Sequence, residues 1–172
     1  MRIRSHVQED LPAIVTLQES NLWRADTPEG MPYVSMKYTP KMLQVMVAGG
    51  THIILEDHEG LCGYILSMSS SFELYYPPLA PMFDRVKALG LDNYLFVGQV
   101  CIAQRHRGKG VLSLMYRAFL SSICDEYEFL ITEVALDNPI SIRAHRSMGF
   151  REVKQYEGER GKAWSIILLG LK

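Results

Sequence analysis

The sequence predicts a single α+β domain, spanning 1–172, in which a central, mixed but mostly antiparallel sheet is flanked by about four helices in a three-layer α/β sandwich. The length of 172 residues suits one domain, and a hydrophobic share of 48% supports a packed core. Strand and helix patterns follow the order β-α-α-β-β-insert-β-α-β-α-β-β. The unit 94–136 reads as strand, helix, strand, so we expect its two strands to be parallel neighbours joined by a right-handed crossover.

Caps and turns divide the first half of the chain. Asp10 is expected to cap a helix that runs to about Asn21, and Thr39 to cap a second helix that ends at Gly49. Apolar patterning predicts the strands 2–5, 52–56 and 61–68. The segment 69–93 then forms an insert that is long for a hairpin connection, and it carries a short helical pattern that stops at Gly90.

The second half is organised in the same way. A long helix is expected from the turn at 104–110 to about Glu126, and Asn138 with Pro139 begins another helix that Gly149 ends. The expected strands are 94–102, 129–136, 152–156 and 164–169, with a polar turn at 157–162.

A basic turn lies between the apolar strand 97–103 and the helix that follows it. In this order the unpaired N–H groups and the dipole of a helix N-terminus favour an anion, and glycine lets a phosphate approach the backbone. Three cations and two glycines are found in the turn: Arg105, Arg107, Lys109, Gly108 and Gly110. The sequence fits neither a P-loop nor a dinucleotide fingerprint. On the turn alone, a solvated connection is an equally good interpretation.

Composition narrows the class of protein. The net charge is −1, and no polybasic segment or long apolar run occurs, so we expect no nucleic-acid partner and no membrane association. The N-terminus lacks the apolar core of a signal peptide. Cys62, Cys101 and Cys124 are scattered, which predicts neither a disulfide frame nor a metal site, and each is expected to pack as a small apolar residue. We therefore expect a reduced, cytoplasmic protein. His106, beside the basic turn, is expected to face outward.

The basic turn resembles the acyl-CoA loop of the GCN5-related N-acetyltransferase (GNAT) superfamily, whose pattern Q/R-x-x-G-x-G/A follows a strand and opens a helix. Arg105–Gly110 matches fully, and the alternative register Arg107–Leu112 departs by ending on Leu112. The first strand and helix, and the segment Asn138–Phe150, are also similar to the family. The resemblance covers nearly the whole chain except the insert.

The resemblance implies acyl transfer from acetyl-CoA to an amine by direct attack in a ternary complex. It also implies that strands 94–102 and 129–136 splay apart around pantetheine, and that a backbone N–H there polarises the thioester carbonyl. A homodimer is common in the family. The residues expected to bind the cosubstrate are Val100, Cys101, Ile102, Arg105, Arg107, Gly108, Lys109, Gly110, Val111, Leu112, Asn138 and Ser141.

The catalytic groups are less well defined. His145 stands where the family often has a tyrosine that acts as the acid, and a packed surface histidine is the alternative. The central strand has no carboxylate. Glu133, in an apolar strand where its pKa should rise, is the best candidate base, and a structural partner is an equally good interpretation. Glu73 is a third choice for the base, and a water relay would need none of them.

The acceptor, a small-molecule amine or a peptide, is not defined by the sequence. Aromatic residues of the two long loops are candidates for its pocket, or for the filling that orders those loops: Trp23, Tyr33, Phe72, Tyr75 and Tyr76. The missing carboxylate and tyrosine slightly favour a second hypothesis, a non-catalytic acyl-CoA-binding or regulatory module. A structural protein without a nucleotide ligand is the third. Cys101 lies in a strand expected to be buried, so a covalent enzyme intermediate is not expected.

Overall fold

A computed structural model of the chain describes residues 1–28, 31–158 and 161–172. Its strands are β1 (Arg2–Ser5), β2 (His52–Asp57), β3 (Gly60–Met68), β4 (Tyr94–Ile102), β5 (Phe129–Ala135), β6 (Arg151–Glu157) and β7 (Ala163–Gly170). Its α-helices are α1 (Leu11–Ser20), α2 (Pro40–Ala48), α3 (Ala80–Lys87), α4 (Val111–Ile123) and α5 (Pro139–Ser147). The element order agrees with the predicted one. Of the turn predicted at 157–162, residues 159 and 160 lie outside the described part.

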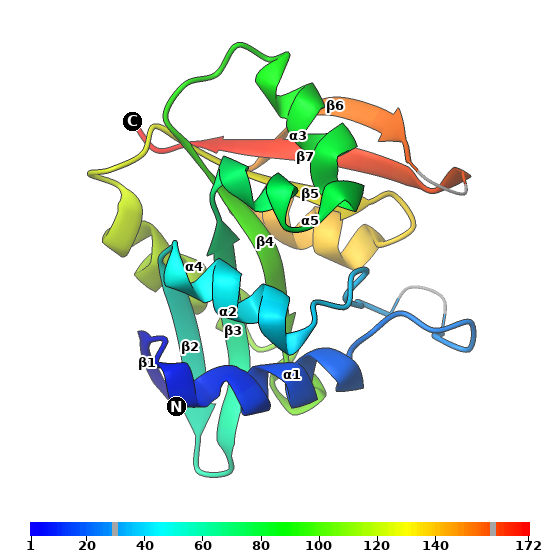
Figure 1. Cartoon of the computed structure of the whole chain (residues 1–172). Helices are drawn as coiled ribbons and strands as arrows, with labels where there is room; N and C mark the ends of the chain where they lie inside the picture. The colour runs from blue at the N-terminus through cyan, green and yellow to red at the C-terminus, as the bar shows by residue number, and fades with distance from the viewer. Residues whose placement is uncertain (29–30, 159–160) are drawn as a thin grey trace.

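The strands form one seven-stranded sheet in the order β1-β2-β3-β4-β5-β7-β6. β4 and β5 are parallel, and the other neighbours are antiparallel. The helices α1, α2 and α3 cover one face of the sheet, and α4 and α5 cover the other (Figure 1). The predicted three-layer α+β domain is therefore confirmed, with α3 of the insert as a fifth helix.

The parallel pair separates soon after it starts. β4 and β5 pair only from Tyr94–Phe129 to Phe96–Ile131, although both strands continue. Figure 1 shows the result: β2, β3 and β4 lie along one common axis, while β5, β7 and β6 turn across them. The splay that the resemblance implied is present.

Apolar residues on both faces of the central strands build the core. Ile54, Tyr64 and Ile65 of β2 and β3 are fully buried, and Phe83 of α3 packs against Phe96 of β4 with ring centroids 5.5 Å apart. Each such side chain contributes about 1.5–3 kcal/mol by leaving water. The insert thus covers the sheet beside the gap between β4 and β5.

Two of the three expected caps form as predicted. The Thr39 side chain accepts a hydrogen bond from the Met42 backbone, and Asn138 accepts one from Ser141. Asp10 differs: its carboxylate accepts from the Val7 backbone and from the Arg4 guanidinium, and it makes no cap on α1. Asp10 pairs with Arg4 of β1 instead of capping α1. This ion pair links the first strand to the start of the first helix.

Among the described helices, none has both the length and the apolar character needed to cross a membrane.

Candidate functional site

A hollow of about 90 Å³ opens where β4 and β5 separate. Gly98 of β4 has no partner on β3, because Gln99 pairs with Leu66 and Val97 with Ser67. A bulge of this kind bends a strand. The hollow is lined from β4, β5, β7, α5 and the loop after α1, by residues that include Tyr33, Gly98, Gln99, Val100, Thr132, Glu133, His145 and Trp164.

Glu133 presents a carboxylate to this hollow from β5. Tyr156 of β6 donates a hydrogen bond to it, and the Arg85 guanidinium of α3 lies 4.2 Å from the centre of the Tyr156 ring. Burial raises the pKa of Glu133 to about 7, against the hydrogen bond from Tyr156 and the charge of Arg85, which lower it. A carboxyl group with this pKa can take up and release a proton near neutral pH.

Two glycines shape the basic turn before α4. Gly108 and Gly110 have φ of +69° and +72°, and a Cβ atom at either would meet nothing within 4 Å. Because side chains are strained at this φ, glycine is favoured even though space is available. The first N–H groups of α4 lack intrahelical partners and face this open turn. The geometry is that of an anion site.

A second hollow, of about 380 Å³, connects this turn with the end of β4 and with α5. Most of the residues expected to bind the cosubstrate line it: Val100, Cys101, Ile102, Arg107, Gly108, Gly110, Val111, Leu112, Asn138 and Ser141. The two hollows adjoin, because the same residues line both: Tyr33, Val34, Val100, Asn138, Ser141 and His145. Together they form one groove from the glycine turn to Glu133.

The three cations of the turn differ in their surroundings. Arg105 pairs with Asp57 at 2.9 Å and with Glu59 at 3.3 Å. Arg107 is half-buried and donates to the Ile102 carbonyl at 3.1 Å and to the Asn21 side chain. Lys109 is exposed. Arg105 and Arg107 therefore brace the turn, and Lys109 is the cation at the rim that faces solvent.

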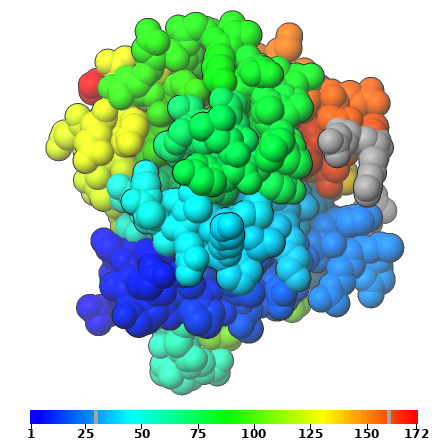
Figure 2. Space-filling model, in the orientation of Figure 1, coloured from blue at the N-terminus to red at the C-terminus, as the bar shows by residue number. Residues whose placement is uncertain are grey.

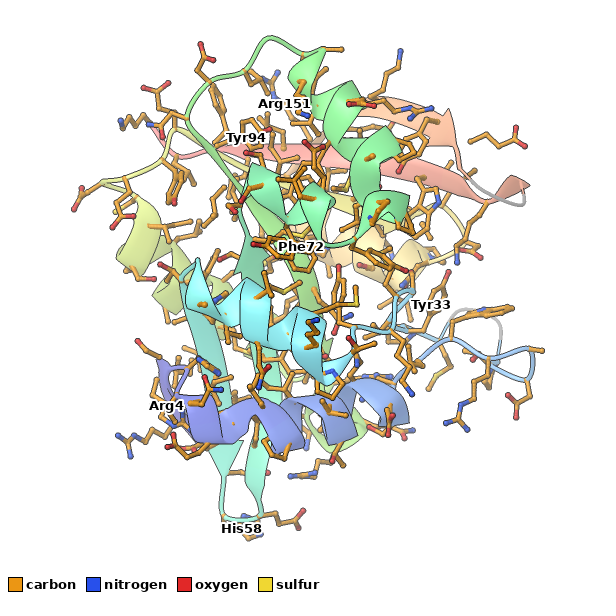
Figure 3. The ribbon with its side chains drawn as sticks, viewed as in Figure 1. Arg4, Tyr33, His58, Phe72, Tyr94 and Arg151 are labelled. Atoms are coloured by element: carbon orange, nitrogen blue, oxygen red, sulfur yellow. The ribbon has the colours of Figure 1, made fainter. Side chains whose placement is uncertain are left out.

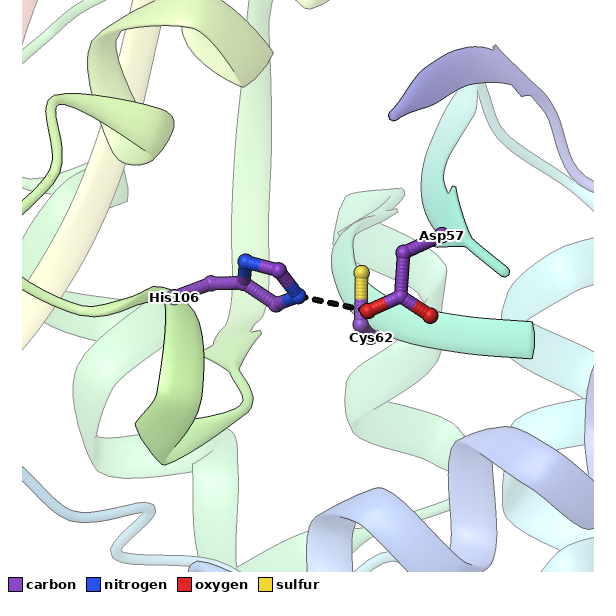
Figure 4. Close-up of side chains that lie close together, drawn as sticks. All are labelled: Asp57, Cys62 and His106. Atoms are coloured by element: carbon purple, nitrogen blue, oxygen red, sulfur yellow. Dashed lines mark hydrogen bonds and ion pairs between the residues drawn. The ribbon is translucent and has the colours of Figure 1, made fainter. Parts of the chain in front are cut away.

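Asp57, His106 and Cys62 lie close together where the β2–β3 hairpin meets the basic turn (Figure 4). The expectation that His106 faces outward is wrong: its side chain is 15% exposed, and Nε2 lies 2.6 Å from an Asp57 oxygen. Hydrogen bonds from His106, the Glu59 backbone and Arg105 hold the pKa of Asp57 well below its usual range. No local pattern indicates this contact, because residues 57 and 106 are far apart in the chain and the fold brings them together.

These three residues are of types that bind metal ions, and their ligand atoms lie within 4.8 Å of one another. Binding a metal would need a thiolate at Cys62 and a free carboxylate at Asp57. Burial raises the pKa of Cys62 to about 11, and Asp57 already accepts hydrogen bonds from Arg105 and His106. We therefore interpret the cluster as part of a hydrogen-bond network around Asp57 that fixes the basic turn.

His145 lies in the wall of both hollows, 5% exposed. Its Nδ1 lies 2.8 Å from the Ser141 carbonyl, so this nitrogen carries the proton, and Nε2 accepts a hydrogen bond from the Tyr116 hydroxyl at 3.0 Å. Burial lowers the pKa of His145, despite the hydrogen bond to Ser141. The ring is consequently neutral at pH 7, and both of its nitrogens are engaged.

The structure separates the aromatic residues that were considered for the acceptor pocket. Tyr33 lines the gap between β4 and β5, whereas Phe72 is 2% exposed and packs on Tyr38 in the core; the two lie apart in Figure 3. Tyr75 is 59% exposed, beside a different hollow at α2. Tyr76 packs on Tyr38, with ring centroids 6.3 Å apart.

Trp23, half exposed, lies near Lys162 and Trp164 of the β6–β7 hairpin. The segment after α1 and this hairpin are neighbours at one edge of the molecule (Figure 2). Glu73 of the insert, the third candidate base, instead pairs with Lys87 at 2.7 Å.

Comparison with known proteins identifies the family. The model of the Acetyltransferase (GNAT) family matches residues 3–150. The chain therefore belongs to the GNAT family of acetyltransferases, as the resemblance predicted. A search of curated proteins finds no match.

Solved structures share the fold at low sequence identity. NAA60 from Arabidopsis thaliana in complex with a bisubstrate analogue is 14% identical, with a TM-score of 0.71 over 98% of this chain and 97% of that one. A ribosomal-protein-alanine N-acetyltransferase from Brucella melitensis is 16% identical, with a TM-score of 0.68 over 99% of both chains. A spermidine N-acetyltransferase SpeG chimera from Vibrio cholerae and hSSAT is 20% identical, with a TM-score of 0.64 over 99% and 97%.

Proposed function

We propose that the protein is an N-acetyltransferase that moves an acetyl group from acetyl-CoA to an amine, by direct attack in a ternary complex. The observation that carries this proposal is the single groove described above. One end is an anion site at the glycine turn, and the other holds a carboxyl group with a pKa of about 7. An acyl-CoA cosubstrate needs an anion site for its phosphates, and an amine acceptor needs a group that can take up its proton.

The glycine turn is the proposed site of the CoA pyrophosphate. The backbone N–H groups at Gly108, Gly110 and the start of α4 would bind its oxygens, with Lys109 adding charge at the rim. The end of β4 from Val100 to Ile102 does not pair with β5, so its backbone groups on that side, other than the Ile102 carbonyl that accepts from Arg107, are available to the pantetheine arm. A backbone N–H there would polarise the thioester carbonyl as the amine attacks.

Glu133 is the proposed general base. An alkylammonium group has a pKa of about 10 and must lose a proton before its nitrogen can attack. A carboxylate with a pKa of about 7 is largely ionised above neutral pH, and it is a stronger base than a carboxylate of ordinary pKa. Tyr156 fixes its orientation. The absence of a carboxylate on β4 is therefore compensated from β5.

The leaving group needs no strong acid from the protein. A thiol has an ordinary pKa of about 8.5, so CoA can leave as a thiolate and take its proton from water. The neutral His145 ring, with both nitrogens hydrogen-bonded, supports a positioning role for this residue rather than the acid role expected from the sequence. Burial raises the pKa of Cys101 to about 12, which also favours direct attack over a covalent thioester on the enzyme.

The acceptor class is an amine on a small molecule or a peptide. The neighbours in fold include enzymes named for a ribosomal-protein alanine and for spermidine, so the fold accommodates both.

The test is release of free CoA thiol from acetyl-CoA across a panel of primary amines and short peptides, followed by mass measurement of the acceptor. Transfer to an amine supports the proposal and excludes a non-catalytic binding module. Saturable acetyl-CoA binding without transfer to any acceptor would instead support that module.

A further inference from the structure

The ammonium group of Lys162 is surrounded by three aromatic rings. Its Nζ lies 4.9 Å from the centroid of Tyr33, 5.2 Å from that of Trp164 and 5.6 Å from that of Trp23. Each distance is within the range of about 6 Å for attraction between a cation and a ring face. We call Trp23, Tyr33 and Trp164 the aromatic cage.

Polar groups complete the surroundings of the same nitrogen. Nζ donates a hydrogen bond to the Tyr33 hydroxyl at 3.1 Å and lies 3.8 Å from the Asp137 carboxylate, and Tyr33 donates to Asp137 in turn. Lysine's ammonium is strongly hydrated, and a surface ion pair with it is weak. A surface lysine is adequately solvated by water and does not need these contacts. Three aromatic rings and a carboxylate around one nitrogen therefore indicate a site that can bind a cation.

The cage borders the proposed acceptor pocket. Tyr33 and Trp164 line the hollow that holds Glu133. Trp164 pairs across the sheet with Ala135, two residues along β5 from Glu133, so Trp164 and Glu133 lie on the same face of the sheet. Trp23 is 50% exposed, so the cage lies on the solvent side of that hollow. An acceptor bound at Glu133 would extend toward the cage.

We propose that the cage is a second cation site of the acceptor pocket, and that Lys162 occupies it until an ammonium group of the acceptor displaces it. This inference rests on the proposed function. It names the acceptor class: a diamine or polyamine whose one amine reacts at Glu133 while a second, unreacting ammonium binds the cage. Asp137 and the Tyr33 hydroxyl, which now bind Lys162, would bind that ammonium.

Direct binding is tested by tryptophan fluorescence. The chain has 2 tryptophans, and both belong to the cage, so their emission reports on the cage without acetyl-CoA or turnover. Titration of the full chain with tetramethylammonium chloride should give a saturable change that sodium chloride at equal ionic strength does not give. Lys162→Met, which removes the internal competitor, should lower the midpoint. The matched control Lys154→Met, at an exposed lysine of β6, should leave the midpoint where it is.

Substrate selection is tested by comparing 1,5-diaminopentane with pentylamine at saturating acetyl-CoA. We expect kcat/KM to favour the diamine by about tenfold or more, the factor that corresponds to 1.4 kcal/mol. Trp23→Ala should reduce this ratio, and Lys162→Met should lower KM for the diamine without lowering kcat.

The outcomes separate this inference from the proposed function. Equal use of the two amines, or no saturable fluorescence change in either the parent or Lys162→Met, overturns the cage proposal while acetyl transfer to amines stands. A saturable change together with no transfer to any amine supports the cage as a cation site and overturns the proposed function.

Discussion

Replacing Glu133 by glutamine separates the chemical role of the carboxylate from its cost to the fold. The side chain keeps its shape and can still accept the hydrogen bond from Tyr156, but it can no longer bind a proton from the amine. Loss of a positioned base lowers rates by about 10²–10⁴. We therefore expect kcat/KM for the amine to fall by about a hundredfold or more, while KM for acetyl-CoA stays close to that of the parent.

The same substitution should stabilise the folded chain at high pH. The pKa of Glu133 rises from an ordinary 4.5 to about 7 on folding. The folded state thus binds this proton more tightly than the unfolded state, and stability falls as pH rises from 4.5 to 7. Above pH 7, burial of the ionised Glu133 carboxylate lowers the free energy of unfolding by its full amount, about 3 kcal/mol. Glu133→Gln avoids this loss, so the variant should melt higher than the parent at pH 8 and close to the parent at pH 4.

The assays are initial rates of thiol release and thermal unfolding, each measured from pH 4 to pH 9. Glu126→Gln, at an exposed position after α4, is the matched control and should change neither. Tyr156→Phe removes the hydrogen bond that lowers the pKa of Glu133. It should move the acidic limb of kcat/KM upward by about one to two pH units, the equivalent of a hydrogen bond to a charged group. A Glu133→Gln enzyme with the rate and pH profile of the parent would refute Glu133 as the base.

Other residues of the site give three further predictions. Cys101→Ala should keep most of the turnover, because that thiol stays protonated; loss of all turnover would indicate a covalent intermediate. Asp57→Asn should lower the melting temperature and raise KM for acetyl-CoA in steady-state assays, because it removes the ion pair with Arg105 and weakens the hydrogen bond with His106 that together hold the basic turn; unchanged values would contradict the bracing role. His145→Ala leaves the buried Tyr116 hydroxyl unpaired and should cost about 1–3 kcal/mol of stability in denaturant unfolding. The pH profile of kcat/KM should keep the shape of the parent's, whereas loss of a decline at high pH that the parent shows would restore His145 as the acid.

Sequence alone predicted the elements well because their signals are local. Thr39 and Asn138 cap their helices as the pattern indicated, and Gly108 and Gly110 adopt the positive φ expected of a glycine turn that opens a helix. Asp10 is the exception. Its carboxylate binds Arg4 of the neighbouring strand, and the spacing of a cap contains no information on such a partner.

The end of the groove at Glu133, where we propose that the acceptor binds, depends on strand order and sheet register, which the sequence does not reveal. Tyr156 of β6 reaches Glu133 of β5 across β7, and this proximity follows from the strand order β5-β7-β6. Lys162 contacts Tyr33, and Trp164 lines the same hollow as Tyr33, although more than a hundred positions of sequence separate them. The local signs of this end of the groove were the apolar surroundings of Glu133 in its strand and the aromatic residues Trp23 and Tyr33 of the loop after α1.

Thermal unfolding with acetyl-CoA tests the central claim most directly. At about 100 times its dissociation constant, a ligand that binds only the folded state adds about 2.7 kcal/mol, so the melting temperature of the parent should rise by several degrees. The rise should vanish in a variant with Gly108→Leu and Gly110→Leu. It should persist with Gly90→Leu, which places the same strain, at a φ of +65°, outside the groove. A parent whose melting temperature does not respond to acetyl-CoA would contradict the account.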